Sequence, residues 1–153
     1  LATADPAGAG TYRANAAAFG ERMTALDAWA EAEFAKVPLG KRKVITGHEA
    51  FGYLAERYKL TLKSPRGIST EAEPSAKGIA ALIRQIRAEK IKAIFIENIS
   101  DRRLIDQLAR EAGAVVGGRL YSDALSAPGG PAATYETLFR TNVSLLTSAM
   151  LQN

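Results

Sequence analysis

The sequence predicts an α/β fold, in which a mostly parallel sheet of about four strands is flanked by helices and preceded by one long helix. Three observations support this prediction. Short β-branched runs alternate with amphipathic segments through the middle of the chain, which is typical of βαβ units and a parallel sheet. The run at 91–96 is rich in isoleucine, as expected of a strand buried on both faces. A longer segment near the start keeps a helical period throughout.

The long helix is expected over 12–34, after a loose start that contains Gly, Ala and Pro. Pro38 and Gly40 break its pattern. We therefore divide the chain into a long linking helix, residues 1–36, and an α/β domain, residues 37–153. The apolar residues of the helix form one stripe at three-, four- and seven-residue intervals: Tyr12, Ala16, Phe19, Met23, Leu26, Ala30 and Phe34.

The first half of the domain is predicted to hold two strands and two helices. The strands are short, over 43–46 and 60–62, and an amphipathic helix lies between them. Pro74 suits the first turn of the next helix, because its missing N–H has no partner to lose there. The apolar residues of these two helices are Phe51, Leu54, Ala55 and Tyr58 in the first, and Ile79, Leu82, Ile83 and Ile86 in the second.

The second half is predicted to hold strands over 91–96 and 114–120, and a closing helix over 134–151. Ser100 can cap the helix between the strands, and Gly113 can end it in the left-handed conformation. Gly117-Gly118 predicts a bulge or a close approach of the backbone to a neighbour. The inward residues of the two helices are Leu104, Ile105, Leu108, Ala109 and Ala112 in the first, and Tyr135, Leu138, Phe139, Leu145, Leu146 and Ala149 in the second.

Composition narrows the function classes. The chain has 153 residues, of which 47% are hydrophobic and 24% charged, as in one ordinary globular domain. No apolar run approaches the roughly 18 residues that suggest a membrane span. The absence of cysteine excludes disulfides and thiolate metal sites. The net charge of +4 is mild and basic residues alternate with acidic ones, so we expect no nucleic-acid binding.

His48, the only histidine, follows the strand over 43–46, and Asp123 follows the strand over 114–120. Because parallel strands end at the same edge of a sheet, these two side chains are expected to converge there, where ligands collect in open α/β sheets. Imidazole nitrogen suits zinc, and a carboxylate suits zinc or manganese. On residue type alone, His48 is more typical of a packed or solvated residue than of a ligand, and Asp123 more typical of a turn residue.

Other motifs are weaker. His48-Glu49 begins like a His-Glu-x-x-His zinc hydrolase motif, but Gly52 stands where the second histidine is needed, so Glu49 is expected in solvent. Glu97, at the end of a buried strand, is a candidate to orient His48. Glu73 fits the favourable charge at a helix N-terminus. The glycines of 113–118 follow a helix and enter a strand, which is the wrong order for a phosphate loop.

Four blocks, HEAFGY (48–53), GISTEAEPS (67–75), IFIEN (94–98) and LYSDAL (120–125), occur in order with helix-length spacers. With them the chain resembles the C-terminal half of the solute-binding proteins of zinc and manganese ABC importers. The resemblance implies that residues 37–153 are the C-terminal metal-receptor lobe of a two-lobe protein. It also implies that His48 and Asp123 are metal ligands, and that two further histidines belong to an N-terminal lobe missing from this sequence.

The resemblance further implies an extracytoplasmic or periplasmic protein that captures zinc, with manganese possible, for a membrane ABC permease and catalyses no reaction. The start of the chain has neither an initiator Met nor signal-peptide features, so we expect a processed or cut chain. Without its partner lobe, the exposed helix stripe and the rim at His48 and Asp123 predict a homodimer, in which two copies complete a four-ligand zinc site.

Two other function classes stay open from the sequence. One is an α/β domain that binds a small ligand, or an enzyme in which His48 is the general base and Asp123 orients it. The other is a structural or interaction domain, which would bind neither a metal nor a small ligand.

Overall fold

The structure is a computed structural model that describes residues 1–65, 75–98 and 102–153. Three features predicted from sequence lie outside these residues: Glu73, Pro74 and Ser100. The block at 67–75 is described only at Ser75, whose hydroxyl oxygen accepts the Gly78 N–H and caps the helix that follows.

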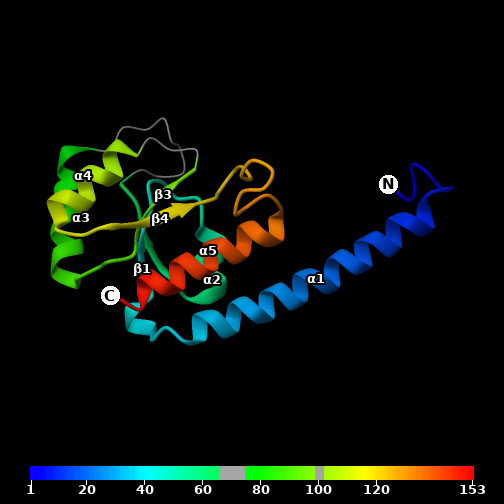
Figure 1. The fold of residues 1–153 in the computed structure, drawn as a ribbon, viewed down its shortest axis with the longest axis horizontal. Helices are drawn as coiled ribbons and strands as arrows, with labels where there is room; N and C mark the ends of the chain where they lie inside the picture. The colour runs from blue at the N-terminus through cyan, green and yellow to red at the C-terminus, as the bar shows by residue number, and fades with distance from the viewer. Residues whose placement is uncertain (66–74, 99–101) are drawn as a thin grey trace.

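The described residues form a four-stranded parallel sheet with strand order β2-β1-β3-β4, so the predicted fold class is confirmed (Figure 1). Strand and helix alternate along the chain as predicted. In chain order, the elements are α1 (Ala9–Ala35), the short 3-10 helix η1 (Leu39–Lys41), β1 (Lys43–Ile45), α2 (Gly52–Tyr58), β2 (Thr61–Lys63), α3 (Ala76–Glu89), β3 (Ile94–Glu97), α4 (Arg103–Ala112), β4 (Val116–Leu120) and α5 (Tyr135–Met150).

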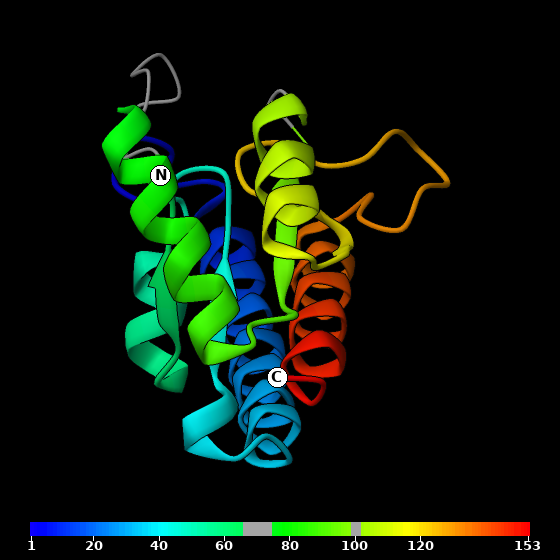
Figure 2. The same ribbon diagram turned by 90° about the vertical axis from the view of Figure 1, so that its left-hand side faces the viewer.

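Helices cover both faces of the sheet, with α3 and α4 on one face and α1, α2 and α5 on the other (Figure 2). Consecutive strand residues point to opposite faces. Val44 and Phe95 therefore join the core cluster of α1, α2 and α5, whereas Ile45 and Ile94 join that of α3 and α4. This two-sided burial explains why the β3 sequence is apolar at successive positions.

Only the C-terminal part of α1 packs into the domain. Leu26, Ala30 and Phe34 are buried, and the last two belong to the core cluster shared with α5. Phe19 is 47% exposed, and the N-terminal half of α1 projects away from the sheet (Figure 1). The predicted apolar stripe is thus buried along half of its length. No helix in the described part of the chain is both long and apolar enough to cross a membrane.

The bounds of all four strands differ from the prediction, by one residue in β1 and β2 and by more at the starts of β3 and β4. β3 begins at Ile94 rather than at residue 91, because the N–H groups of Lys92 and Ala93 donate to the side-chain oxygen of Asn153, at 2.5 and 3.1 Å. β4 begins at Val116 rather than at 114. The predicted close approach at Gly117 is confirmed, since a Cβ there would lie 3.2 Å from the Phe95 ring.

Candidate metal centre

His48 lies in the turn between β1 and α2, at the carboxyl end of β1, and is only 5% exposed. Its carbonyl oxygen closes the turn, because it accepts the Thr46 hydroxyl at 2.9 Å and the Ala50 N–H at 3.1 Å. The backbone of His48 is therefore fixed from both sides. The imidazole position follows from the fold and does not depend on a flexible surface loop.

Glu97, the last residue of β3, lies against one edge of the His48 ring. Its side chain is fully buried, and its Oε1 lies 3.5 Å from His48 Nδ1. The same oxygen accepts the N–H groups of Gly47 at 2.9 Å and His48 at 3.3 Å. One carboxylate therefore holds the turn backbone and faces the imidazole at the same time.

Asp123 lies at the opposite edge of the ring, after β4. Its Oδ2 is 3.8 Å from His48 Nε2, and its side chain is 61% exposed. The structure thus brings together the two residues that the sequence singled out as metal ligands. The pair therefore combines a buried imidazole with a carboxylate that is open to solvent.

Two asparagines hold the segment that carries Asp123. Asn98 donates to the Ala124 carbonyl at 2.9 Å and accepts the Ser122 N–H at 3.2 Å. Asn142, on α5, accepts the Tyr121 N–H at 2.9 Å and donates to the Tyr121 carbonyl at 2.7 Å. Sequence analysis assigned neither asparagine a role, although Asn98 ends one of the four blocks.

The two nitrogens of His48 face different carboxylates, and this determines what the site can bind. A neutral imidazole donates from one nitrogen and accepts at the other. When Nδ1 carries the proton toward Glu97, the lone pair of Nε2 faces the carboxylate of Asp123. Two electron-rich groups then point at each other, and a cation between them is the natural partner. Glu97 lies 3.5 Å behind Nδ1, on the side from which carboxylates orient the imidazole of metal-bound histidines.

The distances fit a shared ion with a small adjustment. Two ligand atoms bound to a tetrahedral zinc at about 2.1 Å lie roughly 3.4 Å apart. The observed 3.8 Å closes to this value with a small rotation of the exposed Asp123 side chain. Within residues 1–65, 75–98 and 102–153, no group of three or more His, Cys, Asp or Glu side chains could hold a metal. The described residues therefore do not form a complete metal site by themselves.

Neighbouring residues behave as the motif analysis predicted. Glu49 is exposed, and Gly52 begins α2 with no ligand to offer, so the hydrolase motif fails in space as well as in sequence. Tyr53 flanks the rim and is 93% exposed. Among the described buried polar atoms, His48 Nδ1, Glu97 Oε2 and Ser122 Oγ have no hydrogen-bond partner, so polar groups gather under this rim.

A family model described as the zinc-uptake complex component A, periplasmic (ZnuA), matches residues 1–149. The manganese-binding lipoprotein MntA of Bacillus subtilis is 33% identical over 150 residues, which cover 95% of this chain and 49% of that protein. The iron-binding protein YfeA of Yersinia pestis is 34% identical over 142 residues, 93% of this chain and 46% of that protein. The chain thus spans about half the length of these relatives.

Solved structures agree. The periplasmic zinc-binding protein TroA of Treponema pallidum superposes with a TM-score of 0.91 at 29% identity, covering 98% of this chain and 56% of that chain. A manganese-bound periplasmic metal-binding protein from Candidatus Liberibacter asiaticus superposes with a TM-score of 0.84 at 31% identity, covering 98% and 55%. The similarity therefore includes the fold as well as the sequence.

Proposed function

The chain belongs to the family of the periplasmic component A of zinc-uptake complexes, and on this premise we propose that it acts as one lobe of an extracytoplasmic metal receptor. Residues 37–153 form the C-terminal metal-receptor lobe, and residues 1–36 contain the linking helix. The receptor captures a divalent transition metal and delivers it to a membrane ABC permease. Capture is reversible coordination, and no bond of a substrate is broken.

The observation that carries this proposal is the orientation of His48. Its Nε2 faces Asp123 at 3.8 Å, and its Nδ1 faces the buried Glu97 at 3.5 Å. The pair supplies one nitrogen and one oxygen ligand to a single ion. An N-terminal lobe supplies the other two ligands of a tetrahedral site, and a second copy of this chain is the alternative source.

The ligand chemistry favours zinc. The names of the relatives include manganese, iron and zinc, so family membership alone does not specify the metal. The ligands of each protein must determine its preference. An imidazole ligand favours zinc over manganese, which prefers oxygen ligands, and zinc also binds more tightly at most nitrogen and oxygen sites. Manganese is the second metal that this site accepts, through Asp123.

General-base catalysis by His48 is less favoured. A base oriented by Asp123 would donate Nε2–H to that carboxylate and use Nδ1 to take a proton. Nδ1 is buried and faces Glu97, so it offers no access to a substrate. The nitrogen that faces the exposed side is Nε2, as metal capture requires.

Zinc titration by calorimetry tests the proposal. With two protein ligands per chain, we expect zinc binding with a Kd on the order of micromolar or weaker. His48→Ala abolishes the binding, and Asp123→Asn weakens it. Glu49→Gln is the matched control, because it removes an exposed carboxylate beside His48 and should leave the binding unchanged. Zinc binding that survives in His48→Ala contradicts the proposal.

His48→Glu separates metal preference from metal capture. The substitution replaces nitrogen by oxygen at the same position, so we expect the ratio of zinc to manganese affinity to fall in competition titrations. An unchanged ratio would mean that His48 does not set the preference.

A further inference from the structure

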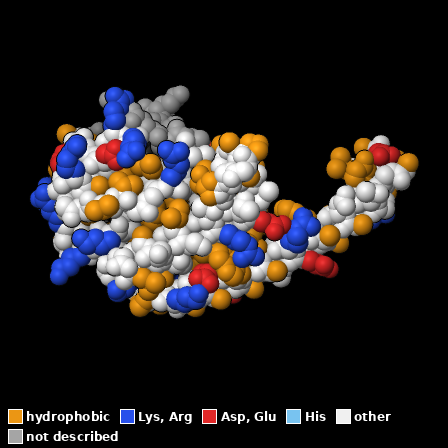
Figure 3. Space-filling model, in the orientation of Figure 1, with side chains coloured by type: hydrophobic (Ala, Val, Ile, Leu, Met, Phe, Trp, Pro, Cys, Tyr) orange, Lys and Arg blue, Asp and Glu red, His pale blue; other side chains and the backbone are white. Residues whose placement is uncertain are grey.

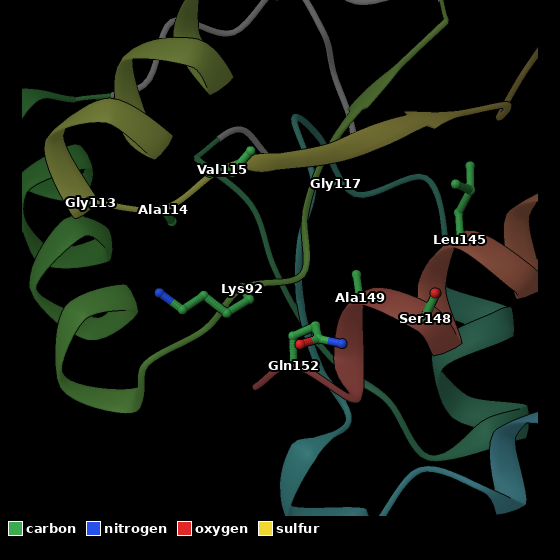
Figure 4. Close-up of a pocket in the computed structure, with 9 residues that line it drawn as sticks. All are labelled: Lys92, Gly113, Ala114, Val115, Gly117, Leu145, Ser148, Ala149 and Gln152. Carbon is green, nitrogen blue, oxygen red and sulfur yellow. The ribbon is translucent and has the colours of Figure 1, made fainter.

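A second hollow lies on the molecule away from the metal centre, at the amino end of β4. It is a groove of about 560 Å³ between the start of β4 and the face of α5. Figure 4 shows Lys92 and the 113–115 segment on one side, and Leu145, Ser148, Ala149 and Gln152 on the other. Its size lies within the range of small-molecule sites.

The body of the groove is apolar. Val115 is 80% exposed at its rim, and Leu145 and Ala149 form the wall on α5. Gly117 adds no side chain to the floor, and a Cβ there would meet Ala149 at 3.5 Å, so glycine keeps this part of the groove open. An aliphatic chain laid along the groove would cover surface that is now in water, which is favourable.

The polar side chains of the groove are exposed to solvent. Within the described part of the chain, the side chains of Lys92, Ser148 and Gln152 make no hydrogen bond or ion pair. The lining contains no acidic residue. On the face drawn in Figure 3, Lys and Arg side chains, with fewer Asp and Glu, lie among hydrophobic ones. The charge that this groove would accept is therefore negative.

We propose that the groove binds an aliphatic monocarboxylate of medium chain length. The chain of the ligand covers Val115, Leu145 and Ala149, and its carboxylate pairs with the ammonium of Lys92, the one charged side chain among the described residues of the lining. A charge-assisted hydrogen bond of this kind is stronger than a neutral one, so Lys92 contributes most to the selection. The site lies at the end of the sheet opposite to His48, because Lys92 precedes β3 and Glu97 ends it.

Octanoate is the probe, titrated into the isotope-labelled chain and followed by amide chemical shifts. We expect saturable shifts at Lys92, Val115 and Gln152. Lys92→Met keeps the aliphatic stem and should weaken binding about tenfold or more, as the loss of one hydrogen bond to a charged group implies. Lys92→Arg should retain the binding. Lys77→Met, which removes an exposed lysine at the start of α3, is the control and should change nothing.

Ser148→Trp tests the location. Ser148 is exposed on α5, so a large side chain is tolerated by the helix and fills the groove. It should abolish octanoate binding while zinc binding is unchanged, which separates this site from the metal centre. Octylammonium that binds as well as octanoate, shifts that persist in Ser148→Trp, or an unchanged affinity in Lys92→Met would each overturn the proposal.

Discussion

The N–H of Gly47 donates a 2.9 Å hydrogen bond to Glu97, and a Cβ at position 47 would lie only 2.5 Å from the other oxygen of the same carboxylate. The carboxylate at the end of β3 thus packs directly against the backbone of the turn after β1. A Cβ at position 47 would force the buried Glu97 carboxylate to shift, so this packing favours glycine. The geometry of His48 depends on this contact.

Gly47→Ala should therefore destabilise the domain and weaken zinc binding together. Overpacking of a buried site costs about 1–3 kcal/mol, and a shifted turn moves the imidazole. Urea unfolding and zinc titration measure the two effects. Gly20→Ala is the control, because a Cβ there meets nothing within 4 Å; it should raise stability slightly. If Gly47→Ala has native stability and unchanged zinc affinity, the Glu97 carboxylate accommodates a Cβ at position 47 and the prediction is wrong.

Glu97→Gln tests whether the carboxylate orients and polarises His48. The variant keeps an oxygen for the Gly47 N–H but removes the negative charge behind Nδ1, so we expect zinc affinity to fall about 10- to 100-fold. Nitrogen chemical shifts of the imidazole should show less of the Nδ1–H tautomer. Glu49→Gln removes a charge of the same sign from an exposed position and is the control. A native tautomer with native affinity would assign Glu97 a purely structural role.

The sequence predicted the fold and the pair at the rim because both depend on local patterns. The alternation of strand and helix places His48 and Asp123 at one sheet edge, whatever the details of the loops. The roles of Asn98 and Asn142 could not be predicted, because each acts on a backbone distant in the chain. The late start of β3 has the same origin, since it follows from the contact of Asn153 with Lys92 and Ala93.

Asp27 links α1 to α2. Its carboxylate accepts hydrogen bonds from Arg57 at 2.6 and 3.1 Å and from the Tyr58 hydroxyl at 2.6 Å. These bonds, the one from Arg57 first, lower the pKa of Asp27 below its usual range. The stabilisation is therefore present above the unfolded-chain pKa of about 4 and is lost as the pH falls through the lower folded value.

Asp27→Asn should lower the free energy of unfolding at pH 7 by about 1 kcal/mol or less, because the ion pair is half exposed and screened by solvent. The difference from the unmodified chain should begin to narrow below about pH 4, where Asp27 of the unfolded chain takes up a proton, and should vanish below the lowered pKa of the folded state. Urea unfolding of the variant and the unmodified chain, at pH 7 and at a pH well below 4, measures the difference in free energy of unfolding. Glu31→Gln, which removes a carboxylate 3.6 Å from Arg57, is the control with an expected effect near zero. A gap that is equal at both pH values contradicts the assignment.

The last prediction concerns association. In the proposed function each chain offers His48 and Asp123 to zinc, which takes four ligands in a closed site, and the projecting half of α1 leaves Phe19 exposed. Two copies related by a two-fold axis can supply two His48 and two Asp123 to shared zinc, and zinc then stabilises the assembled form by binding to it. Sedimentation with zinc and with EDTA should show a dimer strengthened by the metal. His48→Ala should remove the zinc dependence, and Phe19→Ala should weaken association without changing the ligands. A monomer at high concentration under both conditions would exclude this assembly.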